Sequence, residues 1–380
     1  MVDQMKRQKF IIAAIALFIT PGPAFAQVAG FLSSAEPVLG TPPGSQAWRV
    51  RYWTTSVSGD PIEVTGMIAA PTEQSPTMPR RVLAWAHGTS GVVPRCAPSL
   101  ADNFFEITPG LNEAIERGYT VVAPDYPGLG SNMPHAYLSG VGTGRSVLDL
   151  VRAARQLPAA AAGSRFAVWG ESQGGHAALW TGQMASTYAP DLTLVGVAAA
   201  APPTDLAENL EAGSDPSVRA FLTAFTAYSW SQSYGADLST LGRRSTQRVI
   251  TRLARNNCVK LGASPRLGTA LGVMVLRRDL KNVDLGKIEP WARIARENSP
   301  TARPYGVPFL IAQNPDDVIV APAITRAFAQ RLCMNGASVR YLSIIGQGHQ
   351  TSARDTTEET LDWVGERFAG TRAPSDCEAL

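Results

Sequence analysis

The clearest chemical signature in this sequence belongs to Ser172, which lies in the pentapeptide GESQG at 170–174. The pattern G-x-S-x-G is weak by itself, but here it follows an apolar run at 165–170 and opens a helical pattern at 173–188. A strand, a sharp turn and a helix in that order hold a serine hydroxyl above the edge of a sheet. Glycines at the first and last positions let the backbone turn that tightly. We therefore predict that Ser172 is a nucleophile.

A serine hydroxyl is a poor nucleophile near neutral pH unless an imidazole takes its proton and a carboxylate orients that imidazole. When the serine follows a strand in this way, the acid and then the histidine come later in the chain. Two histidines follow Ser172. His176 is one turn away on the same helix, whereas His349 ends the Gly346–His349 segment after the last apolar run. The sequence therefore predicts His349 as the base.

The acid is expected after the apolar run at 307–312, where the segment 314–320 offers two adjacent carboxylates. We predict Asp317 and keep Asp316 as the neighbouring alternative. Asp205, which follows the preceding apolar run, is a further candidate because an acid displaced by one strand can still reach the histidine.

Negative charge develops on the carbonyl oxygen during attack and needs preorganised amide donors. One donor is expected to be the residue after the nucleophile, Gln173. The second is expected in the glycine-flanked turn at 87–91, where the amide of Thr89 is our choice and Ser90 is the alternative. His87 precedes the serine in the chain, so a structural hydrogen-bonding role is expected for it.

Alternating strand and helix patterns supply the frame for these residues. Apolar runs typical of strands lie at 48–57, 61–70, 81–87, 119–125, 165–170, 192–200, 307–312 and 338–345. Helical patterns lie at 111–118, 145–157, 173–188, 323–335 and 356–368. Two hairpin-like strands followed by this alternation predict an α/β fold with a mostly parallel central sheet flanked by helices.

The alternation stops between about 203 and 305, where the segments 221–230 and 267–276 indicate helices without intervening strands. We predict a mainly helical cap over 203–305, inserted into a core made of 27–202 and 306–380. The alternative is a further set of crossovers within the sheet. The cap is expected to cover the serine and to set substrate size, although its apolar residues would also serve as a small core of their own.

The bulk composition agrees with one folded core and an insertion. The chain has 380 residues, of which 45% are hydrophobic and 17% are charged. This composition is typical of a globular protein and excludes a disordered or fibrous chain.

The first 26 residues are typical of a secretion signal. Basic residues precede an apolar run at 10–18, and small residues end the segment at Ala26. The alternative is a membrane anchor, but the apolar run is too short to span a bilayer. We expect cleavage near Ala26 and a secreted or periplasmic protein. Cleavage lowers the formal charge from +3 to +1, because three basic residues and one acid are removed, and we note no basic cluster elsewhere. No nucleic-acid partner is expected.

Four cysteines in an exported chain favour two disulfides over four buried thiols. Three pairings are open to Cys96, Cys258, Cys333 and Cys377. We predict Cys333 with Cys377, which would tie the C-terminal tail to the core, and Cys96 with Cys258, which would fix the cap beside the turn at 87–91. The absence of CxxC spacing and the presence of only four histidines argue against a metal or redox site.

Several motifs resemble the bacterial and fungal secretory lipase family of α/β-hydrolases over nearly the whole mature chain. They are the segments 87–89, 96–99, 125–130, the serine turn, 317–322 and 346–349. The resemblance implies lipase or carboxylesterase activity, a helical cap before the last core strands, and no cofactor. This chain departs from the family in having Asn314-Pro315-Asp316 where members usually carry a Gly-Thr-Ala type of run. His135 also looks familial, and we assign it no role.

The expected substrate is a small-molecule or lipid ester such as a triacylglycerol. Transient contact with a lipid interface and no obligate protein partner are expected. An acyltransferase is the main enzymatic alternative, because only the second nucleophile separates hydrolysis from acyl transfer. A noncatalytic binding protein on this fold would not need serine, acid, histidine and oxyanion turn together. Peptidase activity is a weaker alternative, since nothing in the sequence marks a peptide subsite.

Overall fold

The computed structural model describes residues 28–73, 79–259, 264–346 and 348–380. The predicted secretion signal lies outside these residues. Within them, no helix is long and apolar enough to cross a membrane.

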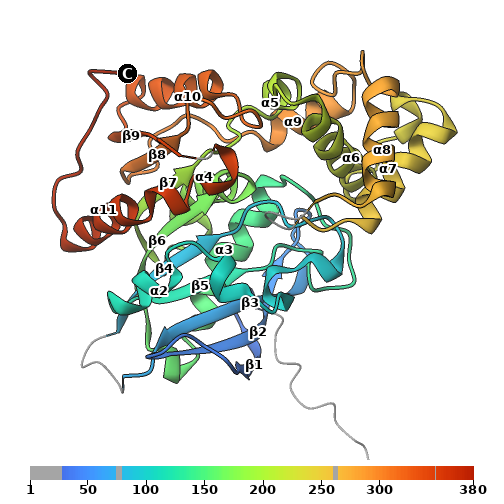
Figure 1. The fold of residues 1–380 in the computed structure, drawn as a ribbon. Coiled ribbons are helices and arrows are strands. Elements are labelled where there is room, and N and C mark those ends of the chain that lie inside the picture. The colour runs from blue at the N-terminus through green and yellow to red at the C-terminus, as the bar shows by residue number, and fades with distance from the viewer. Residues whose placement is uncertain (1–27, 74–78, 260–263, 347) are drawn as a thin grey trace, which may run out of the picture.

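Nine strands of the described residues form one sheet. They are β1 (Leu32–Val38), β2 (Ser45–Thr55), β3 (Pro61–Pro71), β4 (Arg80–Ala86), β5 (Thr120–Pro124), β6 (Ala162–Glu171), β7 (Thr193–Ala200), β8 (Phe309–Gln313) and β9 (Val339–Ser343). Their order across the sheet is β1-β2-β3-β5-β4-β6-β7-β8-β9. The contacts from β1 to β5 are antiparallel, and those from β5 through β4 to β9 are parallel. This arrangement confirms the predicted mostly parallel sheet (Figure 1).

Helices cover both faces of this sheet. The helices of the core are α1 (Phe104–Ile107), α2 (Leu111–Glu116), α3 (Gly140–Ala154), α4 (Gln173–Tyr188), α10 (Pro322–Met334) and α11 (Thr357–Ala369). Helices α3, α4 and α10 share one buried apolar cluster with one face of the sheet. Helices α1, α2 and α11 pack on a second cluster that includes Trp85 and Trp169.

The predicted strands and core helices are present, and the core also contains strand β1 and the short helix α1, which were not predicted. Strand β1 was not predicted, because its sequence LSSAEPV is mostly polar or small and none of its residues is fully buried. An edge strand of this kind pairs through its backbone and leaves little hydrophobic alternation in the sequence.

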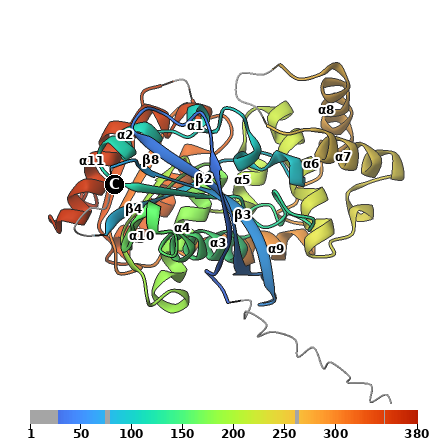
Figure 2. The ribbon, with the colours of Figure 1, turned by 90° about the horizontal axis from the view of Figure 1, so that it is seen from below.

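The chain between β7 and β8 forms a separate cluster of helices, which we call the insertion. Its helices are α5 (Leu206–Ala212), α6 (Pro216–Ser233), α7 (Arg244–Asn256), α8 (Leu267–Asp279) and α9 (Trp291–Asn298). They share a third apolar core, which also takes in Val92, Tyr137 and Leu138 from loops of the main unit. Figures 1 and 2 show α6, α7 and α8 standing beside the sheet rather than on either of its faces. Helices α6 and α8 contain the two predicted segments, whereas α5, α7 and α9 were not predicted.

Short 3-10 helices account for the other helical segments of the described residues. They are η1 (Pro94–Cys96), η2 (Pro98–Leu100), η3 (Pro158–Ala160), η4 (Leu238–Leu241), η5 (His349–Thr351) and η6 (Arg354–Thr356).

Two disulfides are present, and both pairings are those predicted from the sequence. Cys96 of η1 is bonded to Cys258, which follows α7, and Cys333 is bonded to Cys377. The first disulfide therefore joins the core to the insertion. An isolated antiparallel bridge between Gly91 and Cys258 lies beside it.

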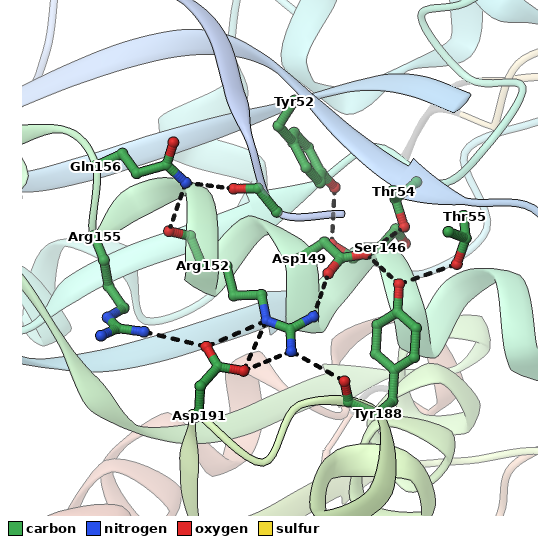
Figure 3. Close-up of polar contacts among 11 residues, drawn as sticks. Tyr52, Thr54, Thr55, Ser146, Asp149, Arg152, Arg155, Gln156, Tyr188 and Asp191 are labelled. Atoms are coloured by element: carbon green, nitrogen blue, oxygen red, sulfur yellow. Dashed lines mark hydrogen bonds and ion pairs between the residues drawn. The ribbon is translucent and has the colours of Figure 1, made fainter. Parts of the chain in front are cut away.

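A buried carboxylate ties α3 to the antiparallel part of the sheet (Figure 3). Asp149 accepts hydrogen bonds from Thr54, Tyr188 and Arg152 at 2.7, 2.7 and 3.0 Å. Burial raises the pKa of Asp149, and these donors act against the rise. Arg152 also reaches the half-exposed Asp191. This carboxylate is fully occupied by structural partners.

One expectation about charge was wrong. We predicted no basic cluster outside the first 26 residues, but α7 gathers four exposed arginines on one side. They are separated by three or four residues in the chain, so only the helix brings them together.

Candidate active site

Ser172 sits at the sharp turn between β6 and α4. Its backbone adopts φ 56° and ψ −121°, a conformation that is strained for a residue with a side chain. The Ser172 amide donates to the carbonyl of Ala200 on the neighbouring strand at 2.9 Å. A Cβ atom on Gly170 would overlap Gly174, and one on Gly174 would overlap the carbonyl of Ala86. Glycine is therefore required on both sides of the serine, as the sequence motif indicated.

The structure brings Ser172, His349 and Asp317 into one hydrogen-bonded chain. His349 Nε2 lies 2.8 Å from Ser172 Oγ, and His349 Nδ1 lies 2.7 Å from Asp317 Oδ2. His349 begins η5 in the loop that follows β9, and Asp317 lies in the loop that follows β8. All three side chains thus sit at the carboxyl ends of parallel strands, where this class of sheet places its sites.

The environment of Asp317 favours a charged carboxylate. Its Oδ1 accepts hydrogen bonds from the amides of Ile319 and Val320 at 2.8 and 2.9 Å, and its Oδ2 accepts from Gln313 Nε2 at 3.0 Å. Burial acts to raise the pKa of Asp317, but His349 and the two amides outweigh it, so the pKa lies below its usual value. A charged acid is the form that can hold an imidazole by its Nδ1–H.

The alternative acids and the second histidine lie elsewhere. The side chain of Asp316 is exposed, and Asp205 accepts from the amide of Glu208 at the start of α5. His176 is fully buried, with Nε2 2.7 Å from the carbonyl of Asn298, and burial lowers its pKa to about 4. None of these three side chains has a hydrogen bond to Ser172 among the described residues.

The turn at 87–91 packs against the nucleophile. A Cβ atom on Gly88 would lie 3.8 Å from Ser172 Cβ and 3.3 Å from the carbonyl of Glu171. The amides of Thr89, Ser90 and Gln173 have no hydrogen-bond partner in the part of the chain that the structure describes. They are free to donate to a developing oxyanion.

The side chains of His87, Tyr126 and Tyr137 hold this turn in place. The ring of His87 stacks on Tyr126 with centroids 4.2 Å apart, and its Nδ1 lies 2.6 Å from the carbonyl of Gly88. Burial lowers the pKa of His87 to about 3, so the ring is neutral near pH 7. The hydroxyl of Tyr137 lies 2.7 Å from Thr89 Oγ1. His87 therefore has the structural role expected from the sequence.

Two further residues of the site, His135 and Glu171, had been given no role from the sequence. The side-chain amide of Gln173 lies 3.3 Å from Nε2 of His135, whose Nδ1 lies 2.7 Å from the carbonyl of Pro127. Burial lowers the pKa of His135 to about 4. The neutral ring can therefore accept from the amide of Gln173 and hold its side chain in place.

Glu171 is the second such residue. It is largely buried, and its Oε1 accepts a hydrogen bond from the amide of Ala353 at 2.8 Å, in the turn that follows His349. Burial raises the pKa of Glu171 to about 7, although this hydrogen bond and the nearby His349 act to lower it. Glu171 thus connects the end of the nucleophile strand to the histidine loop. The motif gives this position as any residue, so the sequence carried no signal for it.

No group of three or more His, Cys, Asp or Glu side chains suited to a metal ion occurs among the described residues. The chemistry that the site supports is proton transfer from Ser172 to His349, with charge compensation by Asp317.

Comparison with known proteins finds relatives over most of the chain. The model of the secretory lipase family matches residues 107–376, a range that contains all three residues of the hydrogen-bonded chain. The chain is 23% identical over 355 residues to Lipase 5 of Candida albicans, covering 88% of this chain and 74% of the relative. It is equally identical over 345 residues to a probable inactive lipase of Mycobacterium tuberculosis, covering 85% of this chain and 74% of the relative.

The fold also matches solved structures. The closed state of Candida antarctica lipase A superimposes with a TM-score of 0.74 at 20% sequence identity, covering 92% of this chain and 84% of that one. This likeness confirms the predicted α/β-hydrolase fold.

Proposed function

Because this chain belongs to the secretory lipase family, we propose that it is an exported lipase or esterase that hydrolyses carboxylic esters through an acyl-enzyme on Ser172. The observation that carries the proposal is the continuous contact from Ser172 Oγ to His349 and from His349 to Asp317, at 2.8 and 2.7 Å. Family membership alone does not imply catalytic activity, since one relative is described as probably inactive.

The proposed reaction has two steps. Ser172 Oγ attacks the ester carbonyl while its proton passes to His349 Nε2, and the charged Asp317 stabilises the imidazolium. The collapse of the tetrahedral intermediate breaks the ester bond, and the leaving alcohol takes the proton from His349. Water then gives a proton to the same nitrogen and attacks the acyl carbon. Collapse of the second tetrahedral intermediate breaks the bond to Ser172 Oγ, which takes the proton back from His349 as the carboxylic acid leaves.

The amides of Thr89 and Gln173 are the proposed donors to the oxyanion. The close approach of Gly88 to Ser172 supports this assignment, because it puts the turn beside the carbon atom under attack. The hydrogen bond between Thr89 and Tyr137 holds the turn in place. Preorganised donors of this kind contribute about 3 kcal/mol each to catalysis.

The insertion is proposed to cover the serine and to limit acyl length. Tyr137, which contacts Thr89, also packs edge-on against Phe225 of α6, and Phe225 contacts Phe221 with centroids 4.5 Å apart. The disulfide between Cys96 of the core and Cys258 of the insertion joins the two regions next to the same turn. Two disulfides and the predicted secretion signal support export of the protein.

The test is hydrolysis of a series of p-nitrophenyl esters of increasing chain length. We expect turnover by the wild type and a fall in kcat of about 10⁶-fold in both Ser172→Ala and His349→Ala, because the two residues act as a unit. Product analysis in water with a competing alcohol separates hydrolysis from acyl transfer. An ester as the main product would replace the hydrolase proposal by an acyltransferase.

A further inference from the structure

The segment 135–137 lies in the loop between β5 and α3 and meets both of the proposed oxyanion residues. Nε2 of His135 lies 3.3 Å from the side-chain amide of Gln173, and the hydroxyl of Tyr137 lies 2.7 Å from Oγ1 of Thr89. His135, Tyr137 and Gln173 are all buried. Two side chains of one short segment therefore hold the side chains of the two residues whose backbone amides are the proposed donors.

The backbone of this segment is bound by α6 of the insertion. The Tyr137 amide donates to Ser229 Oγ at 2.7 Å, and the Ser229 hydroxyl in turn donates to the carbonyl of His135. Trp230 Nε1 donates to the Tyr137 carbonyl at 2.7 Å. Ser229 and Trp230 are buried, and they lie more than 90 positions away in the chain. The insertion thus supplies partners to three backbone groups of the loop.

These three backbone groups have no other hydrogen-bond partner among the described residues. A buried amide or carbonyl without a partner costs free energy, so a loop in that state moves to reach water or another group. Loss of the Ser229 hydroxyl would free the Tyr137 amide and the His135 carbonyl together. The position of the segment therefore depends on α6.

A second contact from the insertion holds the turn at 87–91 on another side. The amide of Val259, which follows α7, donates to the Ser90 carbonyl at 2.8 Å. The isolated bridge between Gly91 and Cys258 lies next to this bond. The turn is therefore held by the insertion directly through its backbone and indirectly through Tyr137.

We propose that Ser229 and Trp230 of the insertion are positioning residues for ester hydrolysis. Through the segment 135–137 they hold Thr89 and Gln173, so that the two backbone amides point to the place where the oxyanion forms. The inference rests on the proposed function, because the oxyanion belongs to that reaction. An oxyanion site is effective only when its donors are fixed before the charge develops. The insertion thus takes part in the chemistry besides covering the serine.

A purely structural role for these contacts predicts a different result. If they only fastened the insertion to the core, their loss would lower the free energy of unfolding and leave the kcat of the folded enzyme unchanged. If they position the donors, kcat falls while KM for a small ester changes little, because the oxyanion appears only after the substrate has bound.

The first test is hydrolysis of p-nitrophenyl acetate by Ser229→Ala. We expect kcat to fall about tenfold with KM close to wild type, since a displacement of 1 Å costs about 10²-fold in rate. A short alkyl trifluoromethyl ketone binds a nucleophilic serine as a hemiketal with a negatively charged oxygen. It should bind this variant about tenfold more weakly than wild type, because that oxygen needs the same donors.

The matched control is Ser233→Ala, one turn further along α6. Its hydroxyl is buried and has no hydrogen-bond partner among the described residues, so the substitution removes the same group from the same helix without breaking a bond. The kcat and the affinity for the ketone should stay at the wild-type values. Wild-type kcat in Ser229→Ala, or an equal fall in the two variants, would overturn the proposal.

Tyr137→Phe tests the route from the insertion to the turn. This variant lacks the hydroxyl that contacts Thr89 and should also lower kcat about tenfold. If Ser229 acts through Tyr137, the variant with both substitutions should lose clearly less than the product of the two single effects, which is about 100-fold. Loss of the full product would overturn the proposal, because it would show that Ser229 acts by another route.

Hydrogen exchange separates this inference from the proposed function, because it needs no catalysis. The peptide that spans 87–91 should exchange its amides faster in Ser229→Ala than in wild type, and at the wild-type rate in Ser233→Ala. A wild type that hydrolyses no ester but shows this difference would refute the proposed function and leave the contact between α6 and the turn in place. Ester hydrolysis at wild-type kcat in Ser229→Ala would refute the inference alone.

Discussion

The core and the insertion hold their functional groups in contrasting ways. In the core, Ser172 is fixed between glycines that tolerate no side chain, and Asp317 receives three hydrogen bonds besides that of His349. In the insertion, Arg244, Arg248, Arg252 and Arg255 of α7 are exposed, and their side chains have no partner among the described residues. Chemistry requires groups held in one geometry, whereas contact with a variable surface requires mobile side chains that are accessible. The difference predicts that substitutions in the core should change turnover, whereas substitution of these exposed arginines should leave turnover of a soluble ester close to wild type.

Apart from loss of Ser172 or His349, the largest effect is expected at the acid of the core. Asp317→Asn should lower kcat by about 10⁴-fold, because an amide cannot hold His349 in the required tautomer. Asp316→Asn is the matched control and should leave kcat close to wild type, since its side chain is exposed. Steady-state kinetics with a soluble ester measures both. If Asp316→Asn lowered kcat more, the acid that orients His349 would be Asp316 and not Asp317.

Removing each disulfide in turn compares the bond that joins the core to the insertion with the bond that lies inside the core. The Cys96–Cys258 bond closes a loop with a sequence separation of 162, and the Cys333–Cys377 bond closes one of 44. Chain entropy then predicts losses of about 5 and about 4 kcal/mol in the free energy of unfolding when each pair is replaced by alanine. Urea unfolding of the two double variants checks the order. If loss of the Cys333–Cys377 bond lowered the free energy of unfolding more, the insertion would be held to the core mainly by side-chain packing.

Glu171 makes the core sensitive to pH. Its pKa is raised from 4.5 to about 7, so between these values the folded protein binds more protons than the unfolded chain, and this residue's contribution to stability falls as the pH rises. Glu171→Gln keeps an acceptor for Ala353 and removes the titration. We expect equal stabilities near pH 4.5 and a variant more stable by about 3 kcal/mol above pH 7. Denaturant unfolding at both pH values measures this difference. Parallel pH profiles for the two proteins would show that the Glu171 carboxylate titrates normally.

The smallest effect is expected at the inner side of the insertion. Phe221 is partly buried and contacts Phe225, which packs on Tyr137 near the proposed oxyanion turn. Phe221→Ala should shift the ratio of kcat/KM between long and short esters by about tenfold, the scale set by a few methylene groups. Val249→Ala, on α7 in the same apolar core, serves as the control for stability alone. An unchanged chain-length profile in Phe221→Ala would reduce the insertion to a scaffold.

The sequence was most informative where local pattern and chemistry coincide. Helix α4 spans the predicted residues because its first turn is set by the glycine-flanked serine and its interior is continuously buried. His349 could be chosen over His176 by chain order alone, and the structure puts His349 against Ser172. Both disulfide pairings followed from where each cysteine lies along the fold.

The insertion and the supporting contacts of the site were less accessible from the sequence. Helix α7 was not predicted, although its few apolar residues, Ile250, Leu253 and Ala254, recur at helical spacing and form one buried side. Its arginines come together on the other side only after folding. Glu171 and His135 act through Ala353 and Gln173, which are far from them in the chain. A single sequence contains no signal for contacts of that range.

The central claim is that the core activates Ser172, and labelling of that residue tests it most directly. Intact-mass analysis after exposure to a fluorophosphonate should find one adduct per chain, and peptide mapping should place it on Ser172. The adduct should be absent from Ser172→Ala and should form far more slowly in His349→Ala, because proton transfer to the imidazole is what makes the hydroxyl reactive. Ester turnover that persists with no adduct, or with the adduct on another residue, would contradict the account.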